Sequence, residues 1–255
     1  MNNFSNTFSD VRVMTKRNLV KFTRMPQLLV FSTIQPVMML LLFTYVFGGA
    51  IKTGVENYIN YLLPGILVQT VLFGATQTGI GLVDDLSRGM IDRFRSLPMS
   101  RLAVLAGRTI SDLLRNLFVV ILMTIAGLFV GFRIDHGIFN FMGALSLILL
   151  FGYAFSWVSA TIGLAVKTPE TAQVAGFIWV FPLAFGSSIF VPVESMSSAI
   201  RAFAEHNPIT YTVNTVRALT LGLPVGNNIW FSLLWIVGII VVFVPLAVNR
   251  YRSIT

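Results

Sequence analysis

Residues 28–48 read LLVFSTIQPVMMLLLFTYVFG, an apolar stretch without a charged side chain. A helix of about 20 apolar residues is needed to cross the hydrocarbon core of a bilayer. Five further stretches are comparably long and apolar, and Arg115, near the start of the second of them, is their single charged residue: 59–83, 113–132, 141–166, 174–193 and 229–248. The sequence therefore predicts an all-α integral membrane protein with six transmembrane helices, forming one domain over residues 1–255.

The composition excludes several classes of protein. Charged residues make up 11% of the chain and mean hydropathy is +0.80, whereas soluble domains average about 25% charged residues. There are no cysteines, which excludes a disulfide framework and a cysteine-based nucleophile or metal site. His136 and His206 lie far apart, without the spacing of metal ligands. We therefore predict no catalytic, cofactor-binding or metal-binding residue in this chain.

The basic residues are distributed unevenly between the predicted loops. With six spans, both termini lie on one side together with the loops after spans two and four. That side holds fourteen of the eighteen Lys and Arg residues, and Lys52, Arg133, Arg201 and Arg217 lie on the other. Basic loops remain in the cytoplasm. We therefore expect a multi-pass protein of the cytoplasmic (inner) membrane with cytoplasmic termini, and its net charge of +8 requires no nucleic acid.

Residues 8–26 have the pattern of an amphipathic helix. Val11, Met14 and Phe22 fall on one stripe at 100° per residue, and basic side chains occupy the remaining circumference. Such a helix next to a membrane span lies in the headgroup plane. It serves either as a lipid anchor or as a contact for a partner protein.

The connection after the second span, residues 84–101, is too long for a simple turn. Asp84 and Asp85 can each pair with Arg88 at helical spacing, and apolar residues lie between the charges. The pattern therefore predicts a short charged helix below the membrane that is suited to docking on a partner. The alternative is a solvated loop.

The stretch 194–227 is predicted to lie outside. Its apolar residues recur at helical spacing, Asn207–Pro208 divides it into two short helices, and Gly222 ends the second. Neither piece is long enough to span, so both are expected to be re-entrant or to lie at the outer interface. Its charged residues are predicted to be solvated or mutually paired: Glu194, Arg201, Glu205 and Arg217.

The chain has no phosphate-binding loop of the Walker A type, because no Gly-Lys-Ser or Gly-Lys-Thr occurs. Energy for transport must come from another chain or from an ion gradient. The main polar groups of the spans are uncharged, namely Gln35, Gln69, Gln77 and Ser156. An ion-driven secondary transporter or channel would need intramembrane carboxylates, and an intramembrane enzyme would need a His, Asp, Glu or Cys constellation. Both alternatives are therefore disfavoured, and an ATPase partner is favoured as the energy source.

Three segments resemble a known family. GMIDRFRSLPMSRLAVLAGRTISDLLRN (89–116), the outer stretch with SSIFVPVESM (187–196) and AFAEHNPITYTVNTVRAL (202–219), and LLPGIL (62–67) resemble the membrane permease of ABC type-2 exporters. The resemblance is greatest to the daunorubicin-resistance branch. It covers almost the whole chain. One departure is Ser197, which follows Met196 where the family usually has proline.

The resemblance implies a permease that forms a homodimer, or a dimer with a close homologue, and binds two copies of a separate ATPase subunit on the cytoplasmic face. ATP and Mg would bind to that partner. The connection after span two corresponds to the family's coupling helix, which implies an ATPase-coupling role for the residues in the matching stretch: Asp85, Arg88, Asp92, Arg93, Arg95 and Pro98. The N-terminal helix also contacts the ATPase in relatives.

The implied function is drug-resistance-type efflux of a hydrophobic or amphiphilic substrate, drug-like or lipid-like. Alternatives are a permease of the same family for a polysaccharide or an ion or, less favoured, a secondary transporter. The many aromatic residues of the spans fit an aromatic cargo, and they fit lipid-facing packing equally well.

Overall fold

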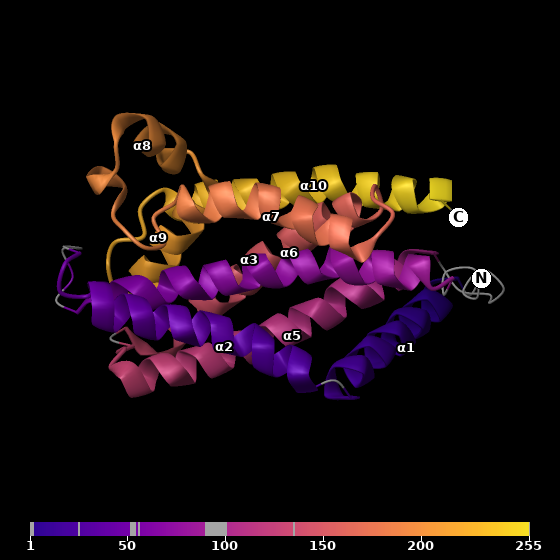
Figure 1. Ribbon diagram of the computed structural model, residues 1–255, viewed down its shortest axis with the longest axis horizontal. Helices are drawn as coiled ribbons and strands as arrows, with labels where there is room; N and C mark the ends of the chain where they lie inside the picture. Colours follow the sequence, from indigo (N-terminus) through magenta and orange to yellow (C-terminus); the bar gives the residue numbers. More distant parts are fainter. Residues whose placement is uncertain are drawn as a thin grey trace.

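The computed structural model describes residues 3–24, 26–51, 55, 57–89, 101–134 and 136–254, and all regular secondary structure in these residues is helical. The helices form one elongated bundle (Figure 1). The chain order is α1 Asn3–Arg24, α2 Pro26–Leu42 with a π-helical turn Phe43–Phe47, α3 Tyr58–Ser87, α5 Arg101–Val130, α6 Gly137–Gly163, α7 Pro169–Phe185, a 3-10 turn Val193–Ser195, α8 Ser198–Glu205, α9 Pro208–Leu221 and α10 Asn228–Ile254.

Four of these helices, α3, α5, α6 and α10, are long and apolar enough to cross a membrane. The other two predicted spans correspond to shorter helices. The first is the apolar helix Thr33–Phe47, which comprises the later part of α2 and the π-helical turn. The second is α7, which has 17 residues. At 1.5 Å per residue α7 is about 26 Å long, whereas the hydrocarbon core is about 30 Å thick. The prediction of an all-helical membrane protein is confirmed, and the count of six spans stays a prediction.

Helix α3 is the centre of the bundle. It packs against α2, α5, α6, α7 and α9, and 72% of its most apolar window is buried, against 22% for α10. The main core cluster includes Leu62, Leu67 and Leu72 of α3 with Phe151 of α6. A helix that is buried on nearly all sides transmits a displacement at one end to the helices around it, because close-packed interiors yield little.

Helix α1 packs against α5. Met14, on the predicted apolar stripe, is 2% exposed, and a Cβ atom added to Gly107 would lie 2.5 Å from the Met14 Cβ. The predicted N-terminal helix is thus present, and it begins at Asn3 instead of residue 8. Its apolar stripe packs against protein at Met14, so α1 is joined to the bundle.

The short helices α8 and α9 lie at one end of the bundle, and α1 and the C-terminal end of α10 lie at the other (Figure 1). The predicted break at Asn207–Pro208 is confirmed: the Asn207 side chain accepts a hydrogen bond from Ile209 N and Pro208 is the first residue of α9. Gly222 ends α9 with a φ of 72°, a left-handed conformation that favours glycine.

Candidate transport cavity and its polar network

A cavity of about 600 Å³ lies between α2, α3, α5 and α7. Its wall combines side-chain amides with apolar side chains, and charged side chains occupy the end near the C-terminus of α3. The lining includes Gln35, Pro36, Met39, Gln69, Phe73, Gln77, Asp84, Arg88, Arg108, Arg115, Asn116, Gln173 and Phe177. The volume is within the usual range for small-molecule sites, about 300–1,000 Å³.

The cavity face of α3 can be followed in the sequence. Gln69, Phe73, Gln77, Ile80 and Asp84 are separated by three or four residues, so they share one side of the helix. Gln35, Gln69 and Gln77 line the cavity. They are three of the four residues named above as the main polar groups of the predicted spans. The fourth, Ser156, is buried in α6, where its hydroxyl donates to the Tyr153 carbonyl oxygen at 2.7 Å.

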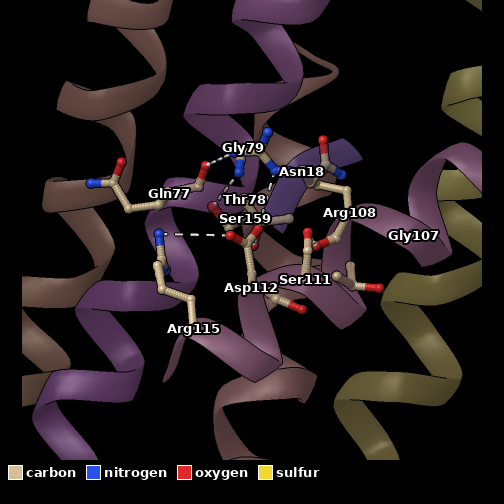
Figure 2. A network of polar contacts seen from close by, with 12 residues as sticks. Asn18, Gln77, Thr78, Gly79, Gly107, Arg108, Ser111, Asp112, Arg115 and Ser159 are labelled. Carbon is tan, nitrogen blue, oxygen red and sulfur yellow. Dashed lines mark hydrogen bonds and ion pairs between the residues drawn. The ribbon is translucent and has the colours of Figure 1, made fainter. Parts of the chain in front are cut away.

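Asp112 is the centre of a polar network beside the cavity (Figure 2). Its side chain is 1% exposed. Its Oδ2 atom accepts hydrogen bonds from Thr78 Oγ1 at 2.7 Å and from Arg108 Nε at 3.2 Å, and its Oδ1 lies 3.6 Å from Arg115 Nη1. Two buried guanidinium groups therefore share one carboxylate.

The same two arginines join α5 to the backbone of α3. Arg108 Nη2 donates to the Gln77 carbonyl oxygen at 3.1 Å, and Arg115 Nη2 donates to the Gly74 carbonyl oxygen at 2.7 Å. The sequence placed Arg115 near the start of the third predicted span, 113–132, and Arg108 before that span. The structure places them within α5, which begins at Arg101, well before residue 113. The charges are accommodated because carboxylate and carbonyl oxygens of the protein surround them.

A close crossing joins α3 to α6 at the same level. The Gly79 N–H donates to Ser159 Oγ at 3.2 Å, and that hydroxyl donates to the Thr76 carbonyl oxygen at 3.1 Å. A Cβ atom at Gly163 would lie 2.6 Å from the Gly79 carbonyl oxygen. Small residues allow the two backbones to approach this closely.

The structure describes two of the six predicted coupling residues, Asp85 and Arg88. Arg88 pairs with Asp84, Nε to Oδ1, at 2.7 Å, as predicted. Asp85 does not pair with Arg88 as expected: its Oδ2 accepts from Arg17 Nη2 of α1 at 2.8 Å. The reason is that Asp85 points from α3 toward the packed helix α1, while Arg88 is largely exposed. Asp92, Arg93, Arg95 and Pro98 lie outside the described residues.

At the opposite end of the bundle, the prediction that Arg217 is solvated or paired with an acid is wrong. Arg217 is 5% exposed and donates to the carbonyl oxygens of Tyr61 at 2.7 Å, Ser188 at 2.5 Å and Ile189 at 3.1 Å. Residues 188 and 189 follow the end of α7, so their carbonyls have no helical partner, and a fork of N–H donors satisfies them. Arg201 and Glu205 form the predicted exposed pair at 2.8 Å.

The cavity is large enough to enclose a small molecule, and its polar and charged side chains can bind one. Within the residues that the structure describes, no three His, Asp or Glu side chains come together as metal ligands. The acids near the cavity are each paired with arginine: Asp84 with Arg88, Asp85 with Arg17, and Asp112 with Arg108 and Arg115.

Comparison with known proteins agrees with this description. Residues 9–221 match the model of the ABC-2 type transporter family. The chain is 34% identical over 237 residues to the daunorubicin resistance ABC transporter permease protein DrrB1 of Streptomyces coeruleorubidus, covering 93% of this chain and 84% of that protein. It is 27% identical over 246 residues to the probable doxorubicin resistance ABC transporter permease protein DrrC of Mycobacterium tuberculosis, covering 95% and 88%.

Another relative is the putative transport permease ycf38 of Cyanophora paradoxa, 28% identical over 213 residues, with 81% of this chain and 72% of that protein covered. The match to the family model, residues 9–221, begins in α1 and ends with α9. It therefore includes the cavity, its polar network, and Arg217 with its carbonyl acceptors. The chain therefore belongs to the ABC-2 type transporter family, as a membrane permease homologous to drug-resistance permeases.

Proposed function

We propose that this chain is the membrane subunit of an ATP-driven exporter and that it moves a hydrophobic or amphiphilic, drug-like or lipid-like substrate outward across the cytoplasmic membrane. The observation that carries the proposal is the cavity. It extends from the amides of Gln35 and Gln69 to Asp84 and Arg88 at the end of α3, where the segment 84–101 begins. One helix, α3, thus both lines the cavity and leads into the segment expected to contact the ATPase.

The energy source is proposed to be a separate ATPase, present in two copies beside a permease dimer. The chain itself has no Walker A loop. The acids near the cavity each have an arginine partner, whereas a proton- or sodium-driven alternative would use intramembrane carboxylates that bind the ion. ATP and Mg would bind to the partner chain, with both termini of the permease on the cytoplasmic side.

Coupling would pass through α3 and α1 together. Asp85 ties α3 to Arg17 of α1 at 2.8 Å, and α1 in turn packs on α5 through Met14. A displacement of segment 84–101 by the ATPase would therefore move α3, α1 and α5 together. The coupling role of Asp85, Arg88, Asp92, Arg93, Arg95 and Pro98 is part of this proposal.

The substrate class follows from the wall of the cavity. Phe73, Phe177 and Met39 give it an apolar side, and the amides give it a polar side, which suits an amphiphile better than a polysaccharide or a bare ion. The names of two relatives refer to resistance to daunorubicin and doxorubicin, and these names agree with an aromatic amphiphilic cargo.

The test is transport by the whole complex. The permease is co-expressed with its ATPase partner, and inside-out vesicles, whose cytoplasmic face is outward, receive ATP in the external medium together with daunorubicin and fluorescent amphiphiles of negative, neutral and positive charge. ATP-dependent uptake of at least one compound is expected, and it should vanish when the lysine of the partner's phosphate-binding loop is replaced by alanine. No uptake of any compound by an intact complex contradicts the proposal.

A matched pair of variants connects uptake to the cavity. Phe177→Ala removes an aromatic wall and should lower uptake about tenfold, since losing a large apolar contact costs about 1–3 kcal/mol of binding. Phe139→Ala on α6 removes a phenylalanine that is 86% exposed and should leave uptake unchanged. Equal effects of the two variants would remove the cavity from the transport path.

A further inference from the structure

Gln69 of α3 lines the cavity and is almost completely buried, with 6% of the residue exposed. Within the residues that the structure describes, its side-chain amide makes no hydrogen bond. A carboxamide has two N–H donors and an acceptor oxygen, and burying such a group without partners is unfavourable. The amide of Gln69 therefore has unused hydrogen-bonding capacity at the cavity wall.

The other three glutamines that line the cavity differ from Gln69 in their surroundings. Gln35, Gln77 and Gln173 are exposed, so their amides can reach groups outside the protein. The amide of Gln69 is enclosed, and it is reached from the cavity. A molecule that enters the cavity is therefore the natural partner for Gln69.

The part of α3 around Gln69 is uncharged. Residues 65–78 contain no Asp, Glu, Lys or Arg. The guanidinium group of Arg115 reaches α3 at the carbonyl oxygen of Gly74, which lies five residues, or about 7.5 Å along the helix axis, beyond Gln69. The chemistry offered at Gln69 itself is thus that of neutral hydrogen bonding.

Thr70 adds an acceptor beside the amide. It is 8% exposed and lines the same cavity. Its hydroxyl donates to the Ile66 carbonyl oxygen at 2.7 Å, so its oxygen can still accept a hydrogen bond. Gln69 and Thr70 together offer donors and acceptors side by side. A hydroxyl or an amide group matches this pattern because it both donates and accepts, whereas a carboxylate only accepts and an ammonium group only donates.

An aromatic surface lies next to this polar pair. Phe73 follows Gln69 by four residues and so shares its side of α3. Phe73 and Phe177 both line the cavity, with ring centroids 6.3 Å apart. The ring of Phe181 packs edge-on against both, at 5.6 and 5.4 Å, and supports their positions. A flat apolar body can therefore pack on these rings while its polar substituent reaches Gln69.

We infer that Gln69 determines specificity by hydrogen-bonding an uncharged hydroxyl or amide group of the cargo, whose aromatic body packs on Phe73 and Phe177. This inference rests on the proposed function and specifies its substrate class. A cargo without such a group leaves the amide of Gln69 unpaired, and a binding site built around a hydrogen bond discriminates against such an analogue.

The experiment compares pyrenemethanol with methylpyrene, which share one aromatic body. Both are titrated onto the full-length permease in phosphatidylcholine nanodiscs, for the natural chain and for Gln69→Met. The ratio of the two affinities should shift against pyrenemethanol by about fivefold to tenfold in the variant, the usual contribution of one neutral hydrogen bond. Partition into lipid is the same for both chains and cancels in this ratio. An unchanged ratio overturns the inference.

Charged probes test the preference for a neutral group. Pyrenecarboxylate and pyrenemethylammonium should each lose less affinity than pyrenemethanol when Gln69 is replaced by methionine. A larger loss for either charged probe overturns the assignment of a neutral cargo group. Ser146→Ala is the control, since it removes a hydroxyl from α6 that is exposed and does not line the cavity, and it should keep the affinity ratio of the natural chain.

Protein stability separates a binding role from a structural one. Gln69→Met replaces an amide that has no protein partner by an apolar side chain of similar size, so the unfolding temperature of the ligand-free permease should stay constant or rise. A clear fall would show that the amide holds the fold together, and it would overturn the inference. Thr70→Val, which removes the neighbouring acceptor, should shift the affinity ratio in the same direction as Gln69→Met and gives a second, independent measurement.

Further outcomes distinguish this inference from the proposed function. If the amide of Gln69 instead contacts a second copy of the permease, Gln69→Met should change the oligomer size and leave the affinity ratio unchanged, which overturns the inference. A complex that exports pyrenemethanol and methylpyrene equally well, with or without Gln69, overturns the inference and leaves the proposed function intact. Selective binding of pyrenemethanol through Gln69, in a complex that exports no compound, would do the reverse.

Discussion

Arg17 of α1 contacts Asp85 of α3 through a 2.8 Å ion pair that joins residues 68 positions apart in the chain. The aspartate is nearly buried and the arginine is 30% exposed. The pair connects the N-terminal helix to the last turn of the central helix, where the proposed coupling segment starts. It makes α1 a neighbour of the proposed coupling segment in addition to any role in lipid anchoring.

A charge swap tests this relationship. Arg17→Asp alone and Asp85→Arg alone place like charges together and should each lower ATP-dependent transport, whereas the double variant should recover most of it. Because Arg17 is partly solvated, we expect a coupling energy of only about 1 kcal/mol, measured as the non-additivity of thermal stability and of transport. Additive effects of the two changes would mean that the pair does not connect the helices in the membrane.

The charges of segment 84–101 are expected to serve docking. Arg93→Glu combined with Arg95→Glu should give a permease that inserts normally and no longer co-purifies with its ATPase or supports export, because like-charge contact at an interface costs several kcal/mol. Arg250→Glu with Arg252→Glu is the matched control, since it changes the charge equally at the end of α10. ATPase capture at matched expression is the measurement, and full capture by the Arg93/Arg95 variant would refute the coupling role.

The orientation is testable by thiol labelling, since the chain contains no cysteine. A cysteine at Ser198, an exposed residue that begins α8, should react with an impermeant reagent in intact cells. A cysteine at Met90 should react only after the cells are opened. The expectation follows from the fourteen basic residues on the predicted cytoplasmic side against four on the other, and the reverse labelling pattern would show that the topology is inverted.

Arg217 is expected to contribute strongly to stability. Arg217→Met removes a buried donor from the carbonyl oxygens of Tyr61, Ser188 and Ile189. The Ser188 oxygen keeps the Tyr61 hydroxyl as a donor, and a buried carbonyl that is left unsatisfied costs about 1–3 kcal/mol. A large fall in the detergent unfolding temperature should result. Arg201→Met, at an exposed ion pair, should change the unfolding free energy by less than about 1 kcal/mol. Similar stability of the two variants would contradict the structural role of Arg217.

The contrast between Arg201 and Arg217 shows what the sequence could predict. Local chemistry determines the ends of α9, because Asn207 caps it, Pro208 starts it and Gly222 stops it, and these boundaries were predictable. The acceptors of Arg217 lie far away in the chain, in the backbone of α3 and of the turn after α7. No pattern around Arg217 reveals that these carbonyl oxygens lie within reach of its guanidinium group.

The same reasoning applies to the cavity. The polar face of α3, Gln69, Phe73 and Gln77, is readable from its spacing, so the residues that line the cavity could be found in part. Within the Asp112 network, the pairs of Asp112 with Arg108 and Arg115 follow helical spacing in α5. The contacts of these residues with α3 could not be predicted, since they depend on how closely α3 approaches α5 and α6. That approach is set by glycines whose individual roles appear only once the helices are packed.

The close approach of α6 to α3 at Gly163 gives a last prediction. A methyl group at Gly163 would lie 2.6 Å from the Gly79 carbonyl oxygen and 2.7 Å from its Cα, and backbone atoms cannot move aside without separating α3 from α6. Gly163→Ala should therefore destabilise the protein by about 1–3 kcal/mol, the usual cost of overpacking, and it should disturb the Ser159 contacts beside the cavity. Gly238 on α10 has no atom within 4 Å of an added Cβ, so Gly238→Ala should be neutral or stabilising by up to about 1 kcal/mol through helix propensity. The two variants make the same chemical change, and only Gly163→Ala is expected to lower the unfolding temperature. If both shift it equally, the close crossing of α3 and α6 does not exist in the folded protein.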